Sequence, residues 1–166
     1  MSARGGRPVV HLLCGLNGAG KTTYARQLAE RLPAVRFGLD AWMLRLYPDV
    51  RYDDAAYPGL AAACQEVIRE TALQVLRAGT DVVFDWNQWS RDRRAYWREW
   101  AVSAGYAARL HHVRVPLETA VARAEARTAA RRPGAHPLDA AGVRHLARLF
   151  EPPGPDEGLP VTLVEG

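Results

Sequence analysis

The stretch Gly15-Leu-Asn-Gly-Ala-Gly-Lys-Thr22 matches the phosphate-binding pattern GxxxxGK[ST] at every fixed position. Its glycines allow the backbone to wrap closely around phosphate with the N–H groups pointing inward. The ammonium group of Lys21 would reach the β- and γ-phosphates, and the hydroxyl of Thr22 would ligate Mg²⁺. We therefore predict a nucleotide site made of Gly15, Asn17, Gly18, Ala19, Gly20, Lys21, Thr22 and Thr23.

The sequence on both sides of this loop favours that interpretation over a chance glycine-rich turn. Val9–Cys14 is short and mostly apolar, which is typical of a strand buried on both faces. Lys21–Leu32 has the apolar spacing of a helix, and Pro33 ends it. A phosphate bound in the loop would therefore lie at the positive end of a helix dipole.

Strands and helices are predicted to alternate along the rest of the chain. The further strands are predicted at 35–38, 81–85, 107–115 and 161–164, and the further helices at 41–47, 59–78, 91–104, 117–132 and 139–150. This order predicts an α/β fold, a three-layer sandwich with a mostly parallel sheet of about five strands. Residues 1–166 are expected to form a single domain.

Composition limits the function without choosing one. The net charge of +4 and the pI near 9.4 favour anionic ligands but do not by themselves indicate nucleic acid. Lysine occurs once, at Lys21, where the loop motif requires an ammonium group. The two cysteines, Cys14 and Cys64, predict no disulfide framework, which favours a cytoplasmic protein. We find no signal peptide and no segment apolar enough to span a membrane.

Two carboxylates follow predicted strands, at the sheet edge where parallel sheets bind their ligands. Asp40 could accept a proton from an attacking hydroxyl, or it could serve as the N-cap of the helix that follows. Asp85 ends the apolar run Val82-Val-Phe, the pattern of a Walker B aspartate that holds Mg²⁺ directly or through water.

Arginines and aromatic residues supply further candidates, each with a structural alternative. Arg123 and Arg127 share a helix face and could clamp phosphate, or they could belong to a solvated basic face. Trp42 and Trp86 could form an aromatic wall for the acceptor, or they could pack beneath a loop. Asn87 could hydrogen-bond the acceptor. The five histidines show no metal-ligand spacing and receive no predicted catalytic role.

These motifs together resemble the small P-loop kinases of the AAA_33 or zeta-toxin-like group, which includes polynucleotide kinase domains and chloramphenicol phosphotransferase. The segments that carry the resemblance are Phe37-Gly-Leu-Asp40, Val82-Val-Phe-Asp85, Ser90-Arg-Asp-Arg-Arg94 and the run from Val115 to Arg127. The resemblance implies that Asp40 is the general base and that Arg94 lies near the acceptor. It also implies an ATP-clamping helical lid at about 117–137. Trp86 departs from the small residues usual in the group.

The predicted function is that of an ATP-dependent kinase, with GTP as an alternative nucleotide and Mg²⁺ as cofactor. It would transfer the γ-phosphate to a hydroxyl of a small molecule such as an antibiotic, a nucleoside or a sugar. A 5′-hydroxyl polynucleotide kinase is one alternative, although nucleic acid is the less favoured partner. A nucleotide-dependent switch without an acceptor is the other. The sequence leaves the oligomeric state open.

Overall fold

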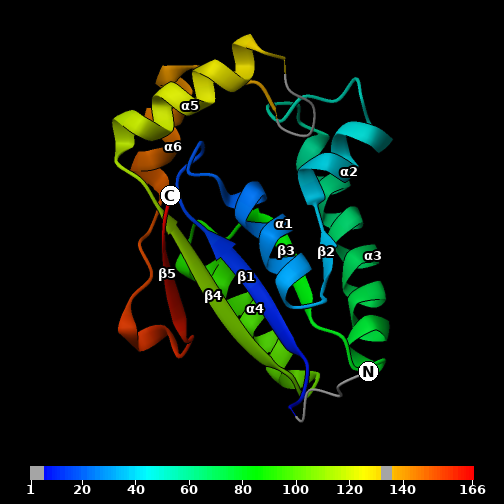
Figure 1. Cartoon of the computed structure of the whole chain (residues 1–166). Coiled ribbons are helices and arrows are strands. Elements are labelled where there is room, and N and C mark those ends of the chain that lie inside the picture. The colour runs from blue at the N-terminus through cyan, green and yellow to red at the C-terminus, as the bar shows by residue number, and fades with distance from the viewer. Residues whose placement is uncertain (1–5, 132–135) are drawn as a thin grey trace.

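The computed structural model describes residues 6–131 and 136–166. Five parallel strands form one sheet in the order β2-β3-β1-β4-β5 (Figure 1). The strands are β1 (Val9–Cys14), β2 (Val35–Phe37), β3 (Val82–Asn87), β4 (Ala107–Arg114) and β5 (Val161–Glu165). The glycine-rich loop therefore leaves the central strand of the sheet, as expected for an α/β fold that binds its ligand at the carboxyl ends of the strands.

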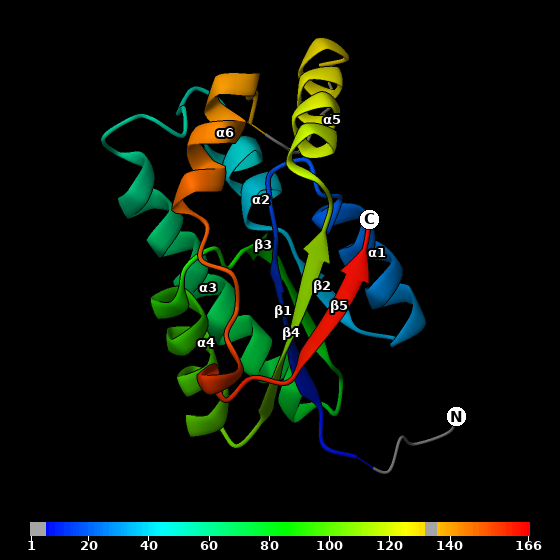
Figure 2. The same cartoon turned by 90° about the vertical axis from the view of Figure 1, so that its left-hand side faces the viewer.

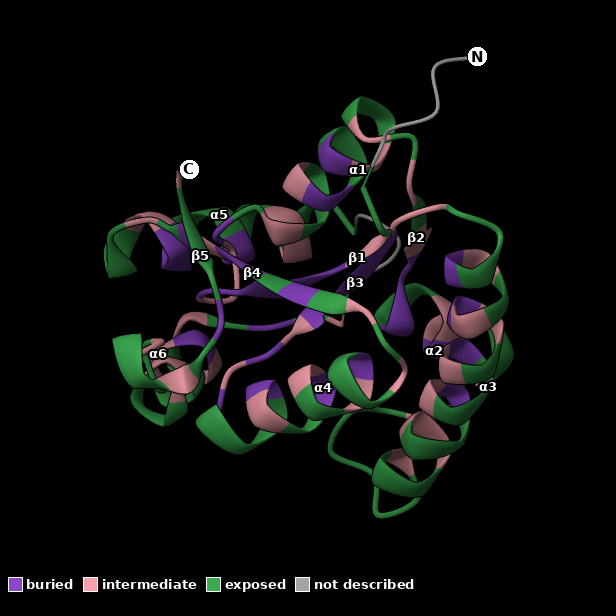
Figure 3. Cartoon of the chain, turned by 90° about the horizontal axis from the view of Figure 1, so that it is seen from below, coloured by how far each residue is buried: buried purple, intermediate pink, exposed green. Residues whose placement is uncertain are grey.

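Helices cover both faces of this sheet and its carboxyl edge. They are α1 (Lys21–Arg31), α2 (Leu39–Leu46), α3 (Tyr57–Arg77), α4 (Arg91–Ser103), α5 (Leu117–Ala129) and α6 (Ala140–Leu149). In Figure 3 the sheet lies between α1 on one face and α3 with α4 on the other. Figures 1 and 2 show α5 and α6 above the carboxyl ends of the strands. The prediction of a three-layer α/β fold is confirmed.

Strand alternation divides the core between the two faces. Val10 and Leu12 point with Phe84 into the large cluster against α3 and α4. Leu13 and Val83 point the other way, against Ala25 of α1. All six side chains are essentially inaccessible to solvent. The alternation matters for the site, because residues on β3 that share the Val83 face point toward α1 and the phosphate loop.

Two predicted boundaries are wrong in ways that affect the site. Strand β3 continues through Trp86 and Asn87, two residues beyond its predicted end at Asp85. Helix α2 begins at Leu39, so Asp40 lies in its first turn and Gly38 is the N-cap. The N-cap alternative for Asp40 is therefore wrong.

Helices α5 and α6 form a small unit of their own. Val121 and Ala124 of α5 pack against Leu138 and Val143, away from the main core. Asp139 caps α6 by accepting a hydrogen bond from the backbone N–H of Gly142 at 2.7 Å. The lid predicted at 117–137 corresponds to α5 and the segment after it, of which residues 132–135, including Arg132, lie outside the described residues.

A buried polar chain crosses the α1 face of the sheet. His11 Nδ1 lies 2.9 Å from His111 Nε2, and His111 Nδ1 lies 2.9 Å from the hydroxyl of Tyr24. His11 Nε2 lies 3.3 Å from a carboxylate oxygen of Asp81. Burial is the main cause that lowers the pKa of His111 from 6.5 to about 4, with the neighbouring His11 adding to it.

This histidine predicts acid-sensitive stability. The unfolded chain protonates His111 below about pH 6.5, but the folded protein does so only near pH 4. We expect this contribution to stability to be complete above pH 6.5 and lost as the pH falls to 4, up to about 3 kcal/mol. Urea unfolding at several pH values measures it, with His111→Gln as the comparison. Parallel pH profiles for the two proteins would contradict the assignment.

Within residues 6–131 and 136–166, no helix is both long and apolar enough to cross a bilayer.

Candidate active site

The backbone of the phosphate loop adopts conformations that require glycine at three positions. Gly15, Gly18 and Gly20 have φ angles of 146°, 89° and 93°. A Cβ atom on Gly15 would lie 2.3 Å from the carbonyl oxygen of Val113, and one on Gly18 would lie 2.1 Å from that of Ala120. The backbone of the loop therefore packs directly against β4 at Gly15 and against the start of α5 at Gly18, and these contacts hold the loop in place.

Lys21 lies across this loop at the start of α1. Its Nζ donates hydrogen bonds to the carbonyl oxygens of Gly15 at 3.0 Å and Leu16 at 2.8 Å. Burial lowers the pKa of Lys21 to about 8, against the opposing effects of Asp40 and Asp85. The two carbonyl oxygens therefore hold the ammonium group over the loop. The negative charge of a bound phosphate would raise the pKa of Lys21 again and keep the group protonated.

Asp85 connects three elements behind the loop. One carboxylate oxygen accepts a hydrogen bond from the hydroxyl of Thr22 at 3.1 Å, and the other accepts one from Arg36 at 2.7 Å. Asp85 is 7% exposed. It reaches Thr22 because it lies on the β3 face that points toward α1. Arg36 reaches Asp85 because β2 pairs with β3 in a register that sets Arg36 beside Val83.

The Thr22–Asp85 pair fits the predicted magnesium site. A hydroxyl oxygen and a carboxylate oxygen are hard donors, and Mg²⁺ is commonly held by one or two such groups with phosphate and water completing its shell. The two groups already touch each other, so one cation could contact both. The described residues contain no cluster of three or more histidine, cysteine, aspartate or glutamate side chains that could hold a metal alone.

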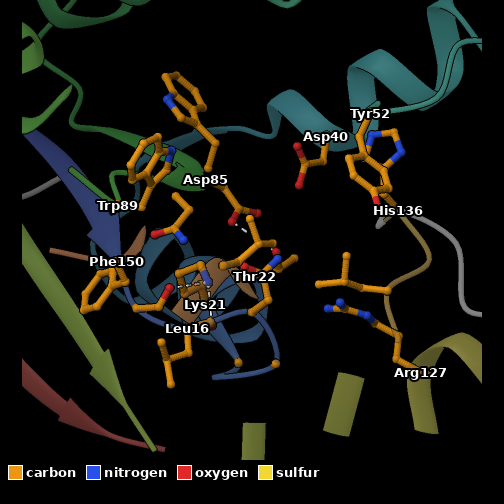
Figure 4. A pocket seen from close by; sticks show the side chains of 18 of the residues that line it. Leu16, Lys21, Thr22, Asp40, Tyr52, Asp85, Trp89, Arg127, His136 and Phe150 are labelled. Carbon is orange, nitrogen blue, oxygen red and sulfur yellow. Dashed lines mark hydrogen bonds between the residues drawn. The ribbon is translucent and has the colours of Figure 1, made fainter. Parts of the chain in front are cut away.

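A single cavity of about 540 Å³ joins the loop to the acidic residues (Figure 4). Its floor is the phosphate loop and the start of α1. Asp85, Trp86, Asn87 and Trp89 form the side that continues from β3. Asp40 lies across from Lys21 and Thr22, and Arg127 of α5 points inward from the opposite wall. The structure therefore brings together loop, carboxylates and lid arginine from segments far apart in the sequence.

Asp40 faces the cavity between the phosphate loop and the side chains of Tyr52 and His136. The residue is exposed to the cavity, whose walls enclose its side chain. This enclosure is the main cause that raises the pKa of Asp40, and the negative charge of Asp85 adds to it. His136, Lys21 and Arg127 act in the opposite direction. A carboxylate with a raised pKa is a better proton acceptor than an ordinary one.

The two predicted lid arginines have different positions. Arg127 is half-buried and lines the cavity. Arg123, one turn earlier on α5, is exposed and does not line it. Of the two arginines, Arg127 is therefore the one whose guanidinium group could contact a phosphate bound in the cavity. The role of Arg123 stays a prediction.

The predicted aromatic wall is only partly present. Trp42 does not line the cavity and instead packs edge-to-face on Phe37, with ring centroids 6.1 Å apart. Trp86 lines the cavity but is 5% exposed, and its ring stacks on Phe84 at 4.7 Å. Because it belongs to β3 and not to a loop, its ring faces the core. Asn87 lines the cavity as expected.

Arg94 requires a correction. Its side chain is fully buried and makes a bidentate ion pair with Glu157 at 2.6 and 2.8 Å. It also donates to the carbonyl oxygens of Gln88 and Glu151. Arg94 does not line the cavity, so its predicted contact with the acceptor is wrong here. Instead it ties the C-terminal segment to the end of β3, and it holds the pKa of Glu157 below its usual range.

Removing Arg94 is expected to destabilise the protein strongly. Arg94→Met leaves the Glu157 carboxylate, only 6% exposed, without its counter-charge, which costs about 3–5 kcal/mol. Arg98→Met on the same helix loses one hydrogen bond, to the carbonyl of Gly158, and should cost about 1 kcal/mol. Urea unfolding measures both, and Glu157→Gln should restore part of the loss in the Arg94→Met protein. Equal effects of the two single variants would refute a structural role for the ion pair.

Several residues of the site were not predicted from the sequence. Tyr52 lies in the connection before α3, Tyr57 is the first residue of α3, and His136 follows the undescribed segment after α5. Arg36 was not considered because an arginine in a short strand has no motif around it. The one signal in the sequence is the alternation of side chains along a strand, which puts Arg36 on the opposite face of the sheet from Val35 and Phe37 and so on the same face as Asp85. The tyrosines and His136 meet through long-range packing that carries no local signal.

The fold and the loop define the class of the protein. A parallel sheet in this order, with GxxxxGK[ST] leaving its central strand, is a P-loop NTPase fold of the kinase type. The family model AAA_33, an AAA domain, matches residues 10–153, and the chain belongs to this family. The resemblance inferred from the motifs is thus confirmed.

Solved structures share this fold at low identity. A protein assigned as a kinase from Chloroflexus aurantiacus J-10-fl is 21% identical with a TM-score of 0.75, covering 96% of this chain and 89% of its own. Kti12 from Chaetomium thermophilum, in complex with ADP-AlF3, is 20% identical with a TM-score of 0.66, covering 94% and 88%. A gluconokinase from Sinorhizobium meliloti 1021 is 18% identical with a TM-score of 0.62, covering 96% and 83%. No curated protein matches the chain.

Proposed function

We propose that this protein is an ATP-dependent phosphotransferase that moves the γ-phosphate to a hydroxyl of a small molecule. One observation carries the proposal: Asp40, a carboxylate with a raised pKa, opens on the same cavity as Lys21 and Thr22 of the phosphate loop. A protein that only binds nucleotide has no need of a proton acceptor at that position. Structural neighbours of the kinase fold support the same reaction class.

In the proposed reaction the acceptor hydroxyl donates its proton to Asp40 as its oxygen forms a bond to the γ-phosphorus. The bond between that phosphorus and the β–γ bridging oxygen breaks, and ADP leaves with the electron pair. Lys21 and Arg127 stabilise the charge that develops on the transferring group. When bound, Mg²⁺ would be held by Thr22 and Asp85 and would neutralise charge on the phosphate oxygens.

Arg36 has a supporting part in this proposal. Its guanidinium group fixes the orientation of Asp85 and offsets the carboxylate charge, with a side chain that is 27% exposed. Helices α5 and α6 would shield the cavity from bulk water, which limits transfer of the phosphate to water instead of the acceptor. Their separate apolar cluster supports a lid that moves as a unit.

The proposal also includes the phosphate donor, the class of acceptor and the cellular compartment. We favour ATP over GTP as the donor and a small molecule over nucleic acid as the acceptor. Both cysteines, Cys14 and Cys64, are buried and free, which supports the prediction of a cytoplasmic protein without disulfides. A 5′-hydroxyl polynucleotide kinase and an acceptor-free switch are the alternatives that the experiment below separates.

The test is acceptor-dependent ADP formation in the presence of Mg²⁺-ATP. Nucleosides, sugars, hydroxylated antibiotics and a 5′-hydroxyl oligonucleotide are supplied separately, and products are identified by mass spectrometry. We expect ADP formation to rise at least about tenfold with one small-molecule class and to stop when EDTA removes the metal. Preference for the oligonucleotide would favour the polynucleotide reaction. ATP binding with no dependence on any acceptor would favour the switch.

A further inference from the structure

The wall of the cavity beside Asp40 is aromatic. His136 meets Tyr57 with ring centroids 5.4 Å apart and an interplanar angle of 79°, and meets Tyr52 at 6.0 Å and 64°. Figure 4 shows Tyr52 and His136 next to Asp40. All three rings line the cavity, and they come from two separate parts of the chain, residues 52–57 and His136. Aromatic rings arranged in this way present flat apolar surfaces to a ligand and keep polar atoms at their edges.

Buried polar atoms of the same cavity have no protein partner. Within the described residues, Trp86 Nε1, Asn87 Oδ1 and His136 Nε2 make no hydrogen bond, although each atom is inaccessible to solvent. Trp86 itself is only 5% exposed and lines the cavity. Buried donors and acceptors are nearly always paired in folded proteins. All three residues line the cavity, so a ligand that displaces the atoms covering these groups would supply their missing hydrogen-bond partners.

The charges are arranged so that the Asp40 end of the cavity does not attract anions. Within the described residues, the arginine and lysine side chains that line the cavity are Lys21 and Arg26 of α1 and Arg127 of α5. These helices carry the residues assigned to the nucleotide. Arg36 forms an ion pair with Asp85, so its positive charge is already balanced. At the acceptor end, the carboxylate of Asp40 would repel a carboxylate, phosphate or sulfate.

From these three observations we infer that the acceptor is an uncharged, ring-bearing alcohol with hydrogen-bonding groups beside the reacting hydroxyl. Its ring lies against Tyr52, Tyr57 and His136, and its polar groups meet Trp86 Nε1 and Asn87 Oδ1. Uncharged nucleosides and cyclic sugars have this chemistry, whereas sugar acids and nucleotides do not. The inference rests on the proposed kinase function and adds the residues that select the acceptor.

The first test compares acceptors that differ only in charge. Nucleosides are paired with their 3′-monophosphates and cyclic sugars with their uronic acids, and kcat/KM is measured with Mg²⁺-ATP. We expect the uncharged member of any active pair to be favoured at least about tenfold. Preference for the anionic member would overturn the inference but leave the kinase function standing. Transfer to no member of the panel, with ATP still bound, would overturn both.

The second test changes the residues. Tyr57→Leu is expected to raise the acceptor KM about tenfold and to leave the ATP KM within about twofold. Tyr96→Leu, at an exposed tyrosine of α4 outside the cavity, is the matched control. Equal increases in both KM values for Tyr57→Leu would overturn its placement at the acceptor.

The unpaired indole offers a more specific variant. Trp86→Phe removes the indole N–H and replaces the indole with a smaller aromatic ring. It should raise the acceptor KM about three- to tenfold and lower the melting temperature no more than the control does. The control is Trp97→Phe, at a buried tryptophan of the same aromatic cluster that does not line the cavity. An unchanged acceptor KM in Trp86→Phe would remove the indole from the acceptor site.

Discussion

Asp40→Asn is expected to reduce phosphoryl transfer by about 10²- to 10⁴-fold while ATP affinity stays within a few fold of wild type. The amide has the shape of the carboxylate but cannot take the proton of the acceptor hydroxyl. The fold should tolerate the change, because Asp40 is exposed to the cavity and α2 is capped by Gly38. Single-turnover transfer and calorimetric ATP binding measure the two quantities separately.

The pH dependence of the same reaction provides an internal check. Asp40 must be unprotonated to act, and its enclosure and Asp85 raise its pKa above the ordinary value of 3.8. The wild-type transfer rate should therefore fall as the pH decreases through this raised value, and Asp40→Asn should lack that dependence. Asp53→Asn, at an exposed carboxylate paired with Arg51, is the control and should behave like wild type. Unchanged turnover in Asp40→Asn would remove Asp40 from the mechanism.

Lys21→Ala is expected to lower transfer about 10²- to 10³-fold and to weaken ATP binding. Nζ lies over the loop on the carbonyl oxygens of Gly15 and Leu16, and no other lysine exists in the chain to replace it. Lys21→Arg keeps the charge, but its planar fork does not fit the same compact site, so it should restore little activity. Retained activity in Lys21→Arg would show that charge alone is sufficient there.

The altered pKa of Lys21 adds a measurable signature. In the free protein this group loses its proton near pH 8, and bound phosphate would hold the proton on. ATP affinity should therefore decrease as the pH rises above 8, with proton uptake on binding in that range. Isothermal titration calorimetry in buffers of different ionisation enthalpy measures the uptake. The dependence should disappear in Lys21→Ala, and its persistence there would assign it to another group.

The sequence predicted those parts of the site that depend on residues close together in the chain, such as a motif or a continuous apolar run. The phosphate loop needs glycines at fixed positions, and the φ angles of Gly15, Gly18 and Gly20 show why. Val9–Cys14 was bounded correctly because a buried parallel strand is a continuous apolar run followed by a glycine break. Asp85 and Thr22 were predicted to hold the same metal ion, and the structure brings their side chains within hydrogen-bond distance. Each follows an apolar run of a parallel strand, so both lie at the carboxyl edge of the sheet.

The errors arise where tertiary packing decides. Trp86 looked like a loop residue, but β3 continues beyond Asp85, and alternation turns the indole into the core. Arg94 looked like a substrate ligand because its partner, Glu157, lies 63 residues away. No periodicity or spacing could link these two residues. The same limit hid the contacts of His136 with Tyr52 and Tyr57, which now define the proposed acceptor end.

The most direct test of the proposed function follows the γ-phosphate itself. ATP labelled at that phosphate is incubated with the protein, Mg²⁺ and the pooled hydroxyl compounds, with Asp40→Asn beside wild type. We predict a labelled small-molecule product that forms with wild type and is lost with Asp40→Asn, although both proteins bind ATP. Release of the label only as inorganic phosphate, at equal rates in the two proteins, would contradict a kinase that uses Asp40 as its base.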